Sequence, residues 1–488
     1  MKKIFLAGEW VEGGGEPSTS YFPADGSINA RFSTASVENV NEAVEKAHAA
    51  WQESSWRSSL PSQRARVLFN AAQLIEQHVD ELAALQTRDN GKPLQETRGL
   101  VMSAAGTARY MASALETMDE ELTNQRNSDF LTMSVHEPLG VIAAITPWNS
   151  PSASEMQKIA PAIAGGNAVI LKPAAVTSLI ALELAKIFEE AGLPKGLLSV
   201  LPGSGSVVGN ALVNHPLVRK ISFTGGTRTG KQLAHVAAER LITTSLELGG
   251  KSPTIVLEDA DLDLAVNGVI YGIFSSAGQA CIAGSRLFVH QKHYEEFLTR
   301  LIEKTKKLRV GHPEDPSTQI GPLIDENHLN SVDAYVQQAL SESGKVVTGG
   351  QRLTQGELAK GSYYAPTIIT GLKNSASVCQ EEIFGPVLVV MSFDDEEQLI
   401  EQANDNVYGL AAGIWTENYR RAWSLARRLE VGTVWINTYK KFSISAPFGG
   451  FKESGVGREK GRLSILSYMQ QKTIYLGLNT QPDSWCDS

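Results

Sequence analysis

Residues 168–248 read AVILKPAAVTSLIALELAKIFEEAGLPKGLLSVLPGSGSVVGNALVNHPLVRKISFTGGTRTGKQLAHVAAERLITTSLEL. Short apolar runs, typical of buried strands, alternate in this stretch with segments whose apolar residues have helical spacing. We expect strands at 168–172, 197–201, 220–223 and 243–248, and helices at 178–192, 207–214 and 230–239. Strands that alternate with helices predict a parallel, doubly wound α/β sheet.

A second alternating region begins near Pro253. It contains strand-like segments at 285–290, 387–393 and 433–437 and a helix-like segment at 294–308. This pattern predicts a second α/β domain. The chain before the first sheet reads as rich in helix, with helices expected at 40–51 and 62–85.

Two strand-like segments lie outside both alternating regions. One falls within Asn127–His136 and the other is the tail 472–478. Neither belongs to an alternating core, so we interpret both as parts of an arm that pairs with another subunit.

The composition excludes several classes of protein. The chain has 488 residues, 42% of them apolar, and a formal net charge of −9. This balance excludes a disordered protein and shows no basic surface for nucleic acid or for an anionic membrane. No apolar run approaches a membrane span, and the apolar stretch at residues 4–7 is too short for a signal peptide. We therefore expect a cytoplasmic protein.

The three cysteines are too few for a disulfide framework and too far apart for a Cys-rich zinc site. Cys379 and Cys486 are expected to be ordinary buried residues. Cys281 differs because it stands among small residues in Gly278-Gln279-Ala280-Cys281-Ile282-Ala283-Gly284, where a substrate can approach. A thiol needs a lowered pKa or a nearby base to act as a nucleophile. No histidine lies in a recognisable protease context.

Glu247 and Asn149 are further candidates for chemistry. Glu247 ends an apolar strand in Leu246-Glu247-Leu248-Gly249-Gly250. It reads either as a general base in a dry cleft or as a strand-end carboxylate paired with Lys251. Asn149 lies between Pro147 and Pro151, which restrict the backbone. Its amide is either a fixed donor to an oxyanion or a partner of its own loop.

Two segments suggest phosphate or ribose binding. The turn Phe223-Thr224-Gly225-Gly226-Thr227-Arg228-Thr229-Gly230 joins a strand to a helix, where a phosphate can approach the helix N-terminus. Lys172, at the end of a strand, can reach a ribose or phosphate, although a strand-end lysine is often only solvated. Gly203-Ser204-Gly205 with Gly209 fits the dinucleotide fingerprint poorly and is interpreted as a glycine turn.

Taken together, seven ordered motifs resemble the NAD(P)-dependent aldehyde dehydrogenase superfamily. They are Pro147-Trp148-Asn149, Leu171-Lys172-Pro173, Phe223–Thr227, Leu246–Lys251, Gly278–Cys281, Glu381-Glu382-Ile383-Phe384-Gly385-Pro386 and Pro447-Phe448-Gly449-Gly450. The resemblance spans nearly the whole chain. It implies an NAD(P)-binding domain at 1–118 and 138–250, a catalytic domain at 251–465, and a β oligomerisation arm at 119–137 and 466–488.

The resemblance also implies roles for individual residues. Cys281 would be the nucleophile, Asn149 would hold the oxyanion, and Glu247 would activate the hydrolytic water. Glu382 would bind the nicotinamide ribose, Lys172 the adenosine ribose, and the Gly225–Gly230 turn would face the pyrophosphate. The implied cofactor-binding residues are Ile145, Thr146, Trp148, Lys172, Ala175, Gly225, Gly226, Thr227, Gly230, Leu248, Glu382 and Phe384. The implied substrate pocket consists of Ser150, Ser154, Gln157, Ile282, Lys440, Phe442 and Phe448.

Two departures from the family pattern concern the cofactor. Many NAD-preferring members carry a glutamate three positions after the lysine, where this chain has Ala175. The usual Gly-Ser-Thr-Glu turn is here Gly225-Gly226-Thr227-Arg228, which replaces an anion with a cation. Since the carboxylate that would repel a 2′-phosphate is missing, we expect NADP to be accepted as well as NAD.

The pocket residues predict a polar substrate. Ser150 and Gln157 replace aromatic residues of many relatives, and Lys440 and Lys441 fall in the loop at the pocket mouth. This favours an aldehyde that carries a carboxylate or several hydroxyls. The alternative is that both lysines point to solvent.

The resemblance leaves other functions open. The leading interpretation is a hydrolytic, non-acylating enzyme that forms a homodimer or homotetramer and needs no metal. A CoA-acylating semialdehyde dehydrogenase of the same fold, a catalytically silent relative, and a cysteine hydrolase are the alternatives. Glu247 argues against acylation to CoA, because that reaction has less use for a water-activating base.

Overall fold

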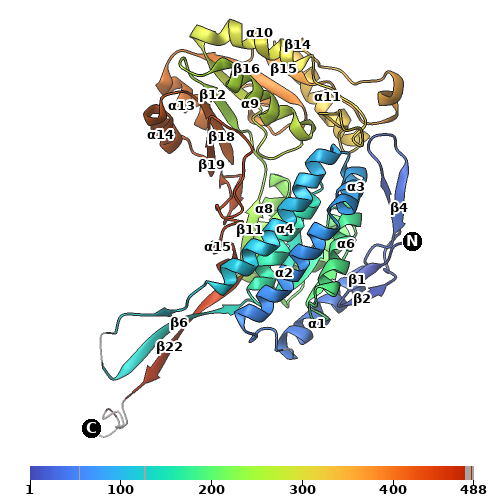
Figure 1. Ribbon diagram of the computed structural model, residues 1–488, viewed down its shortest axis with the longest axis vertical. Coiled ribbons are helices and arrows are strands. Elements are labelled where there is room, and N and C mark those ends of the chain that lie inside the picture. Colours follow the sequence, from blue (N-terminus) through green and yellow to red (C-terminus); the bar gives the residue numbers. More distant parts are fainter. Residues whose placement is uncertain (54, 126–127, 479–484, 486–488) are drawn as a thin grey trace.

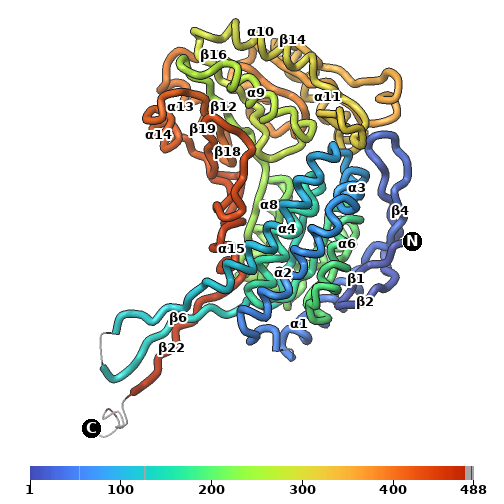
Figure 2. Tube along the Cα trace, viewed as in Figure 1, coloured from blue at the N-terminus to red at the C-terminus, as the bar shows by residue number. Residues whose placement is uncertain are grey.

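The computed structural model describes residues 1–53, 55–125, 128–478 and 485. Two lobes, each built on its own sheet, lie beside one another, and a thin arm built from a third sheet projects away from both (Figure 1). In the tube view, strands β6 (Phe130–Pro138) and β22 (Met469–Gly477) extend side by side from the lower lobe (Figure 2).

The first lobe contains a mixed sheet with a parallel centre. In the described residues its order is β2-β1-β9-β8-β7-β10-β11-β21. Strands β9 to β11 are parallel, whereas β1, β2 and β21 are antiparallel to their neighbours. The strands are β1 (Ile4–Leu6), β2 (Glu9–Val11), β7 (Val141–Ile145), β8 (Ala168–Lys172), β9 (Leu198–Val200), β10 (Val218–Thr224), β11 (Thr243–Glu247) and β21 (Gly455–Val456).

The parallel strands β8, β9, β10 and β11 fall in the expected segments, whereas β7 was not among the expected strands. Every residue of β7 and of β8 is buried, which is typical of strands covered on both faces. The helices around this sheet are α1 (Val37–Glu53), α2 (Pro61–Gln77), α3 (Val79–Asn90), α4 (Leu94–Glu116), α5 (Pro151–Ala164), α6 (Ser178–Glu190), α7 (Asn210–Asn214) and α8 (Thr227–Arg240).

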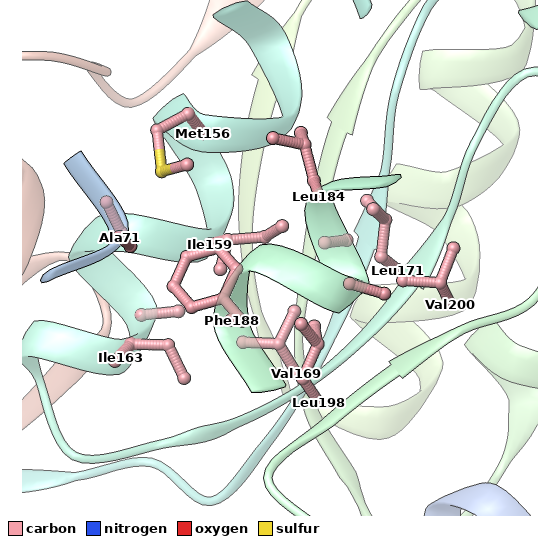
Figure 3. Close-up of a cluster of buried hydrophobic side chains, with 14 of the residues drawn as sticks. Ala71, Met156, Ile159, Ile163, Val169, Leu171, Leu184, Phe188, Leu198 and Val200 are labelled. Atoms are coloured by element: carbon pink, nitrogen blue, oxygen red, sulfur yellow. The ribbon is translucent and has the colours of Figure 1, made fainter. Parts of the chain in front are cut away.

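The core of this lobe forms where helices pack on β8 and β9. Met156, Ile159 and Ile163 of α5 lie against Leu184 and Phe188 of α6, with strand residues Val169, Leu171, Leu198 and Val200 beside them (Figure 3). Ala71 of α2 closes the same cluster. Burial of these side chains holds α5 firmly on the sheet, and Asn149 lies in the turn just before this helix.

Two expectations for the first lobe are corrected. The single helix expected at 62–85 is two helices, because His78 has φ −105° and ψ 21° between α2 and α3. Apolar spacing runs through this break, and neither glycine nor proline marks it. The amino-terminal region also contains strands β1 and β2 and the hairpin β3 (Ser18–Tyr21) and β4 (Ile28–Phe32). β1 is fixed by its pairing with the remote β9, a contact that local pattern does not reveal.

The second lobe contains the other α/β sheet. Its order in the described residues is β14-β15-β16-β13-β12-β18-β19, and only the β14–β15 pair is antiparallel. The strands are β12 (Pro253–Val256), β13 (Arg286–His290), β14 (Lys345–Thr348), β15 (Thr367–Thr370), β16 (Val387–Phe393), β18 (Ala411–Trp415) and β19 (Thr433–Ile436). The helices are α9 (Leu262–Phe274), α10 (Tyr294–Thr305), α11 (Glu326–Ser341), α12 (Ser377–Gln380), α13 (Glu396–Asn404) and α14 (Tyr419–Arg428), whereas α15 (Leu463–Leu466) packs on α5 of the first lobe. Two α/β sheets confirm the expected fold class.

The carboxyl-terminal part of the chain returns to the first lobe. Strand β21 pairs with β11, where Glu247 lies opposite Gly455, although both β21 residues fall in the range expected for the second domain. β20 (Phe451–Lys452) lies just before β21 in the chain and pairs with the short strand β17 (Tyr408–Gly409). A segment from the second lobe therefore lies directly beside Glu247.

The arm consists of the two strands that the sequence left outside both cores. β6 (Phe130–Pro138) pairs antiparallel with β22 (Met469–Gly477), and β5 (Glu121–Leu122) pairs with the other edge of β6. Residue 127 of the expected segment lies outside the described residues. Ile474, Tyr475 and Leu476 of β22 are exposed. In the described residues no helix is long and apolar enough to cross a membrane.

Candidate active site

Cys281 lies in a tightly constrained loop of the second lobe. The loop begins with the 3-10 turn η3 (Ser275–Gly278), in which Ser276 and Ala277 have φ of 59° and 52°. A Cβ on Gly278 would lie 2.0 Å from the carbonyl oxygen of Gly385, so only glycine fits there. The Glu96 carboxylate accepts hydrogen bonds from the backbone N–H and hydroxyl of Ser276. Strained backbone held in this way is typical of a functional loop.

The thiol of Cys281 is neutral at physiological pH. Burial raises its pKa to about 12, and the carboxyl groups of Glu382 and Glu247 raise it in the same direction. The side chain is nevertheless partly exposed to the cavity described below. A base must therefore take the proton when this sulfur attacks a substrate. Cys379, in contrast, is fully buried in the core of the second lobe, as expected, and Cys486 lies outside the described residues.

Glu247 is a candidate base that borders the same cavity as Cys281. Burial raises the pKa of its carboxyl well above the ordinary value of 4.5, and the negative charge of Glu459 raises it further. Its Oε2 has no hydrogen-bond partner among the described residues. A Cβ on Gly449 would lie 2.9 Å from Oε1, so a glycine makes room for this carboxylate. Among the described residues, Glu247 forms no ion pair with Lys251, so the alternative interpretation as a strand-end carboxylate paired with this lysine is not supported.

A buried ion pair lies behind Glu247. Lys158 Nζ contacts Glu459 Oε1 at 2.5 Å and donates to Ser222 Oγ at 3.3 Å. The ammonium of Lys158 lowers the pKa of Glu247 and so opposes the effect of Glu459. Glu247 is therefore held between opposing charges, as a group that must both take and release a proton needs.

Asn149 is brought next to the cysteine loop. Its Nδ2 donates to the backbone carbonyl of Gln279 at 3.0 Å, two residues before Cys281. Asn90 Nδ2 lies 3.5 Å from the carbonyl oxygens of Trp148 and Asn149. These contacts fix the amide from the first lobe beside the nucleophile of the second, where it can serve a developing oxyanion.

A cavity of about 810 Å³ joins these groups at the carboxyl edge of the first sheet. It contains residues at the carboxyl ends of four neighbouring strands, namely Thr146, Gly225 and Leu248 directly after β7, β10 and β11, and Ala174 two residues after β8. Of the implied site residues, those that line it are Asn149, Glu247, Cys281, Ile145, Thr146, Trp148, Lys172, Gly225, Gly226, Leu248, Glu382 and Phe384. In doubly wound sheets, nucleotides bind at this edge.

The Glu382 end of the cavity is built around two glycines. Glu382 Oε1 accepts a hydrogen bond from the N–H of Gly250 at 3.1 Å, and a Cβ on Gly249 would lie 2.5 Å from Oε2. Burial raises the pKa of Glu382 to about 7. Phe384 has φ 58° and meets the Trp148 ring edge-to-face, with centroids 5.3 Å apart. A carboxyl acceptor beside two aromatic rings suits a ribose hydroxyl and a flat ring.

The other end of the cavity suits a nucleotide. Burial lowers the pKa of Lys172 to about 8, and its Nζ donates to the carbonyl of Pro173 at 2.6 Å. Gly225 and Gly226 precede the N-terminus of α8, which favours negative charge. These donors fit a dinucleotide, because a phosphate can bind at the helix end while a ribose binds at the lysine.

Three implied cofactor residues lie outside the cavity lining. Thr227 Oγ1 accepts from the N–H of Gly249 at 3.2 Å, and a Cβ on Gly230 would lie 2.4 Å from the Leu248 side chain. Ala175 is exposed one residue after the lining residue Ala174. Thr227 and Gly230 therefore support the cavity wall through Gly249 and Leu248.

Sequence reasoning missed part of the lining. Gly205, Ser206, Gly209 and Asn210 border the cavity beside Lys172. The first three belong to the π-helical turn Gly205–Gly209, the segment interpreted above as a plain glycine turn. The glycine spacing was the signal that could have found them. The remaining missed residues are Pro147, Ala174, Val213, Phe223, Thr224, Thr229, Gln232, Leu233, Val236 and Gly249.

The implied substrate residues fall into two groups. Ser150, Ser154 and Gln157 are half-buried, and Ser154 and Gln157 form a partly exposed face on the otherwise buried α5. Ile282 is buried among Leu410, Trp435 and Tyr439, a cluster against which Cys281 and Phe448 pack. The rings of Phe442 and Phe448 meet edge-to-face with centroids 5.5 Å apart.

The two lysines of the mouth loop differ in direction. Lys440 Nζ donates to Ser275 Oγ at 2.8 Å, so its side chain turns toward the cysteine loop. Lys441 is exposed and lies 6.0 Å from the Tyr271 ring centroid. The two-cation expectation is therefore corrected, because only Lys440 of this pair faces the cysteine loop. In the described residues no group of three His, Cys, Asp or Glu side chains could hold a metal ion.

Comparison with known proteins agrees with this geometry. The sequence model of the aldehyde dehydrogenase family matches residues 10–474. The chain belongs to the aldehyde dehydrogenase family. Among similar solved structures, an aldehyde dehydrogenase from Bacillus cereus in complex with NAD⁺ is 39% identical, covers 98% of this chain and 97% of its own, and has a TM-score of 0.95. A betaine aldehyde dehydrogenase from Staphylococcus aureus, also in complex with NAD⁺, is 35% identical over 99% of this chain and 96% of its own, with a TM-score of 0.97. The resemblance to the aldehyde dehydrogenase superfamily that the sequence motifs indicated is therefore confirmed.

Proposed function

We propose that this enzyme oxidises an aldehyde to the carboxylic acid with NAD or NADP, through a thioester on Cys281. The observation that carries the proposal is that Cys281, Asn149, Glu247 and Glu382 border one cavity although they come from both lobes. When bound, the dinucleotide supplies a nicotinamide that accepts hydride from the substrate carbon.

The first half of the reaction uses the thiol and the amide. The sulfur of Cys281 forms a bond to the aldehyde carbon while its proton passes to water in the cavity. The developing negative charge on the substrate oxygen is stabilised by the amide of Asn149 and the backbone N–H of Cys281. Collapse of this oxyanion expels the hydride and leaves a thioester on Cys281.

The second half of the reaction releases the acid. Glu247 takes a proton from a water as that water attacks the thioester carbon, and the sulfur leaves. The unpartnered Oε2 of Glu247 is free among the described residues to meet such a water. Glu459, balanced by Lys158, makes the negative form of Glu247 unfavourable and so favours its proton uptake.

The remaining assignments follow from the same division of the chain. We assign 1–118 and 138–250 to the NAD(P)-binding domain, 251–465 to the catalytic domain, and 119–137 with 466–488 to an oligomerisation arm. The exposed apolar residues of β22 favour a homodimer or homotetramer. We assign the enzyme to the cytoplasm.

The proposed hydrolytic reaction is tested against the CoA-acylating alternative by product analysis. We expect the purified enzyme with NAD and an aldehyde to form one carboxylic acid for each NADH without CoA. The acid is measured by chromatography and the NADH by absorbance. Turnover that requires CoA and yields an acyl-CoA would contradict the assignment of Glu247.

The cofactor preference gives a separate prediction. Ala175 and Arg228 are both exposed near the Lys172 end of the cavity, with no carboxylate at either position. We expect a kcat/KM for NADP within about a thousandfold of that for NAD. Ala175→Glu should lower the NADP value by about tenfold or more and change the NAD value by less than about threefold, because a carboxylate repels the 2′-phosphate.

The matched control for this prediction is Val176→Glu. Val176 is exposed and directly follows Ala175. Val176→Glu therefore adds the same charge one residue further along the chain from Lys172. Steady-state kinetics with both cofactors measure the effect. An equal loss with NAD and NADP in Ala175→Glu would sink the idea that this position reads the 2′-phosphate.

A further inference from the structure

Two lysines of the carboxyl-terminal segment turn inward beside the nucleophile. Lys440 and Lys460 both have left-handed backbone, with φ of 54° and 58°. Lys460 is 7% exposed, and Lys440 is half-buried. A long charged side chain on a surface loop normally extends into water. Here both side chains point inward instead, that of Lys460 to the Phe442 ring and that of Lys440 to Ser275.

The ammonium of Lys460 fills an aromatic site. Its Nζ lies 3.8 Å from the ring centroid of Phe442 and 5.3 Å from that of Phe448. In the part of the chain that the structure describes, no carboxylate forms an ion pair with it. Two aromatic rings at this distance attract a cation, and such rings bind quaternary ammonium ligands in other sites. Here the protein's own ammonium occupies that place.

The ammonium of Lys440 lies on the loop that carries the nucleophile. Its hydrogen bond to Ser275 Oγ places it six residues before Cys281 and on the turn η3. A Cβ on Gly106 of α4 would lie 2.7 Å from the Ile444 side chain, so the loop that follows Lys440 closes tightly against the first lobe. Lys440 is therefore held at the wall between the two lobes rather than at an outer edge.

Three ammonium groups lie close enough to Cys281 to interact with it electrostatically. Lys92 is a third buried ammonium, and Cys281 interacts electrostatically with all three. Glu96 is the carboxylate that acts on Lys92 and Lys440, and it is already engaged with Ser276. Glu459 and Glu247 act on Lys460, but Glu459 is paired with Lys158.

Burial of these cations opposes their charge. It lowers the pKa of Lys440 to about 7 and that of Lys460 to about 8. An anion beside either ammonium would favour the charged form of that lysine and would be partly desolvated itself, which strengthens the attraction. The site is therefore better satisfied by an anionic ligand than by water.

We propose that Lys440 and Lys460 bind an anionic group at the far end of the aldehyde substrate, while the aldehyde carbon meets the sulfur of Cys281. The aromatic walls Phe442, Phe448 and Trp435 contact the carbon chain between the two ends. A cationic aldehyde is rejected, because Lys460 already fills the aromatic site and repels a second cation. This inference rests on the proposed function and names its class of substrate.

The test compares aldehydes that differ in charge but little in size. The probes are 4-oxobutanoate against butanal, 4-carboxybenzaldehyde against 4-methylbenzaldehyde, glyceraldehyde 3-phosphate against glyceraldehyde, and betaine aldehyde as the cation. For the wild type we expect kcat/KM to be about a hundredfold higher for the anionic member of at least one pair. The carboxylate and phosphate pairs distinguish the two sources of the anion.

The variants locate the effect. Lys460→Met should lower kcat/KM for the preferred anionic aldehyde by about a hundredfold, mainly through KM, and change the neutral partner by less than about threefold. It should also raise the rate with betaine aldehyde. Lys460→Arg should keep the anion preference, and Lys440→Met should weaken it. Lys441→Met, the matched control on the outward-facing neighbour, should leave it unchanged.

The outcomes separate the two proposals. Oxidation of neutral aldehydes without any anion preference, or an equal loss on charged and neutral aldehydes in both Lys460→Met and Lys440→Met, overturns this inference alone. If Lys460→Met does not fold, Lys460→Arg and Lys440→Met are used instead. They distinguish a selective loss on anionic aldehydes from an equal loss on charged and neutral aldehydes. Absence of NADH with every aldehyde, neutral ones included, overturns the proposed function and this inference with it.

Discussion

Cys281→Ala is expected to abolish aldehyde-dependent reduction of NAD, a loss of about 10⁴-fold or more in kcat, while NAD binding stays within about twofold of the wild type. The thiol forms the bond to the substrate carbon, and no other cysteine of the described residues borders the cavity. Without the covalent adduct the aldehyde carbon has no oxyanion from which to expel hydride. Absorbance of NADH and titration of cofactor binding measure the two effects.

The control for this variant is Cys379→Ala. Cys379 is fully buried in the core of the second lobe and does not line the cavity, so its loss should leave kcat within about twofold. If Cys281→Ala kept aldehyde-dependent NADH formation while Cys379→Ala lost it, the nucleophile would be misassigned. If both variants kept the wild-type kcat, covalent catalysis by either cysteine would be excluded.

Glu247→Gln is expected to separate the two halves of the reaction. Steady-state kcat should fall by about 10²–10⁴-fold, because the amide cannot take a proton from the hydrolytic water. A rapid burst of about one NADH per active site should remain, since the thioester still forms but is not hydrolysed. Stopped-flow absorbance measures the burst, and mass spectrometry of the quenched enzyme detects the acyl group on Cys281.

The pH dependence checks the same assignment. Burial and Glu459 raise the pKa of Glu247, so its carboxyl is protonated over a wider pH range than an ordinary glutamate and gains its basic form only as pH rises. Wild-type kcat should therefore increase with pH through the raised pKa, and Glu247→Gln should lack this limb. A variant with no burst at all would instead place Glu247 before hydride transfer, as the base that Cys281 needs. A variant with full activity would remove it from the mechanism.

The arrangement of the parallel sheets could be predicted from local sequence. The runs at 168–172 and 387–393 are β8 and β16, because a strand covered on both faces is apolar at every position. The strands β1, β2, β14 and β15 were among those that escaped prediction. These four are short and lie near a sheet edge, and the position of each depends on a partner strand.

The candidate site divides in a similar way. Asn149, Glu247 and Cys281 were found because each interrupts a regular pattern with a reactive side chain among prolines, glycines or apolar residues. Their meeting in one cavity was not visible in the spacing, since 34 residues separate Glu247 from Cys281 and the first and second lobes supply different members. The hydrogen bond from Asn149 to Gln279 is the contact that joins them.

The sequence by itself determined the two α/β sheets, the reactive residues and the family, because each depends on residue types and their order along the chain. Only the tertiary structure decided which cations reach the nucleophile. Lys440 and Lys441 are neighbours in sequence, yet one bonds to Ser275 and the other is exposed. Lys460, twenty residues on, is turned inward by its left-handed backbone and held by the rings of Phe442 and Phe448. Side-chain direction in such a loop depends on backbone conformation and long-range packing, which no local pattern carries.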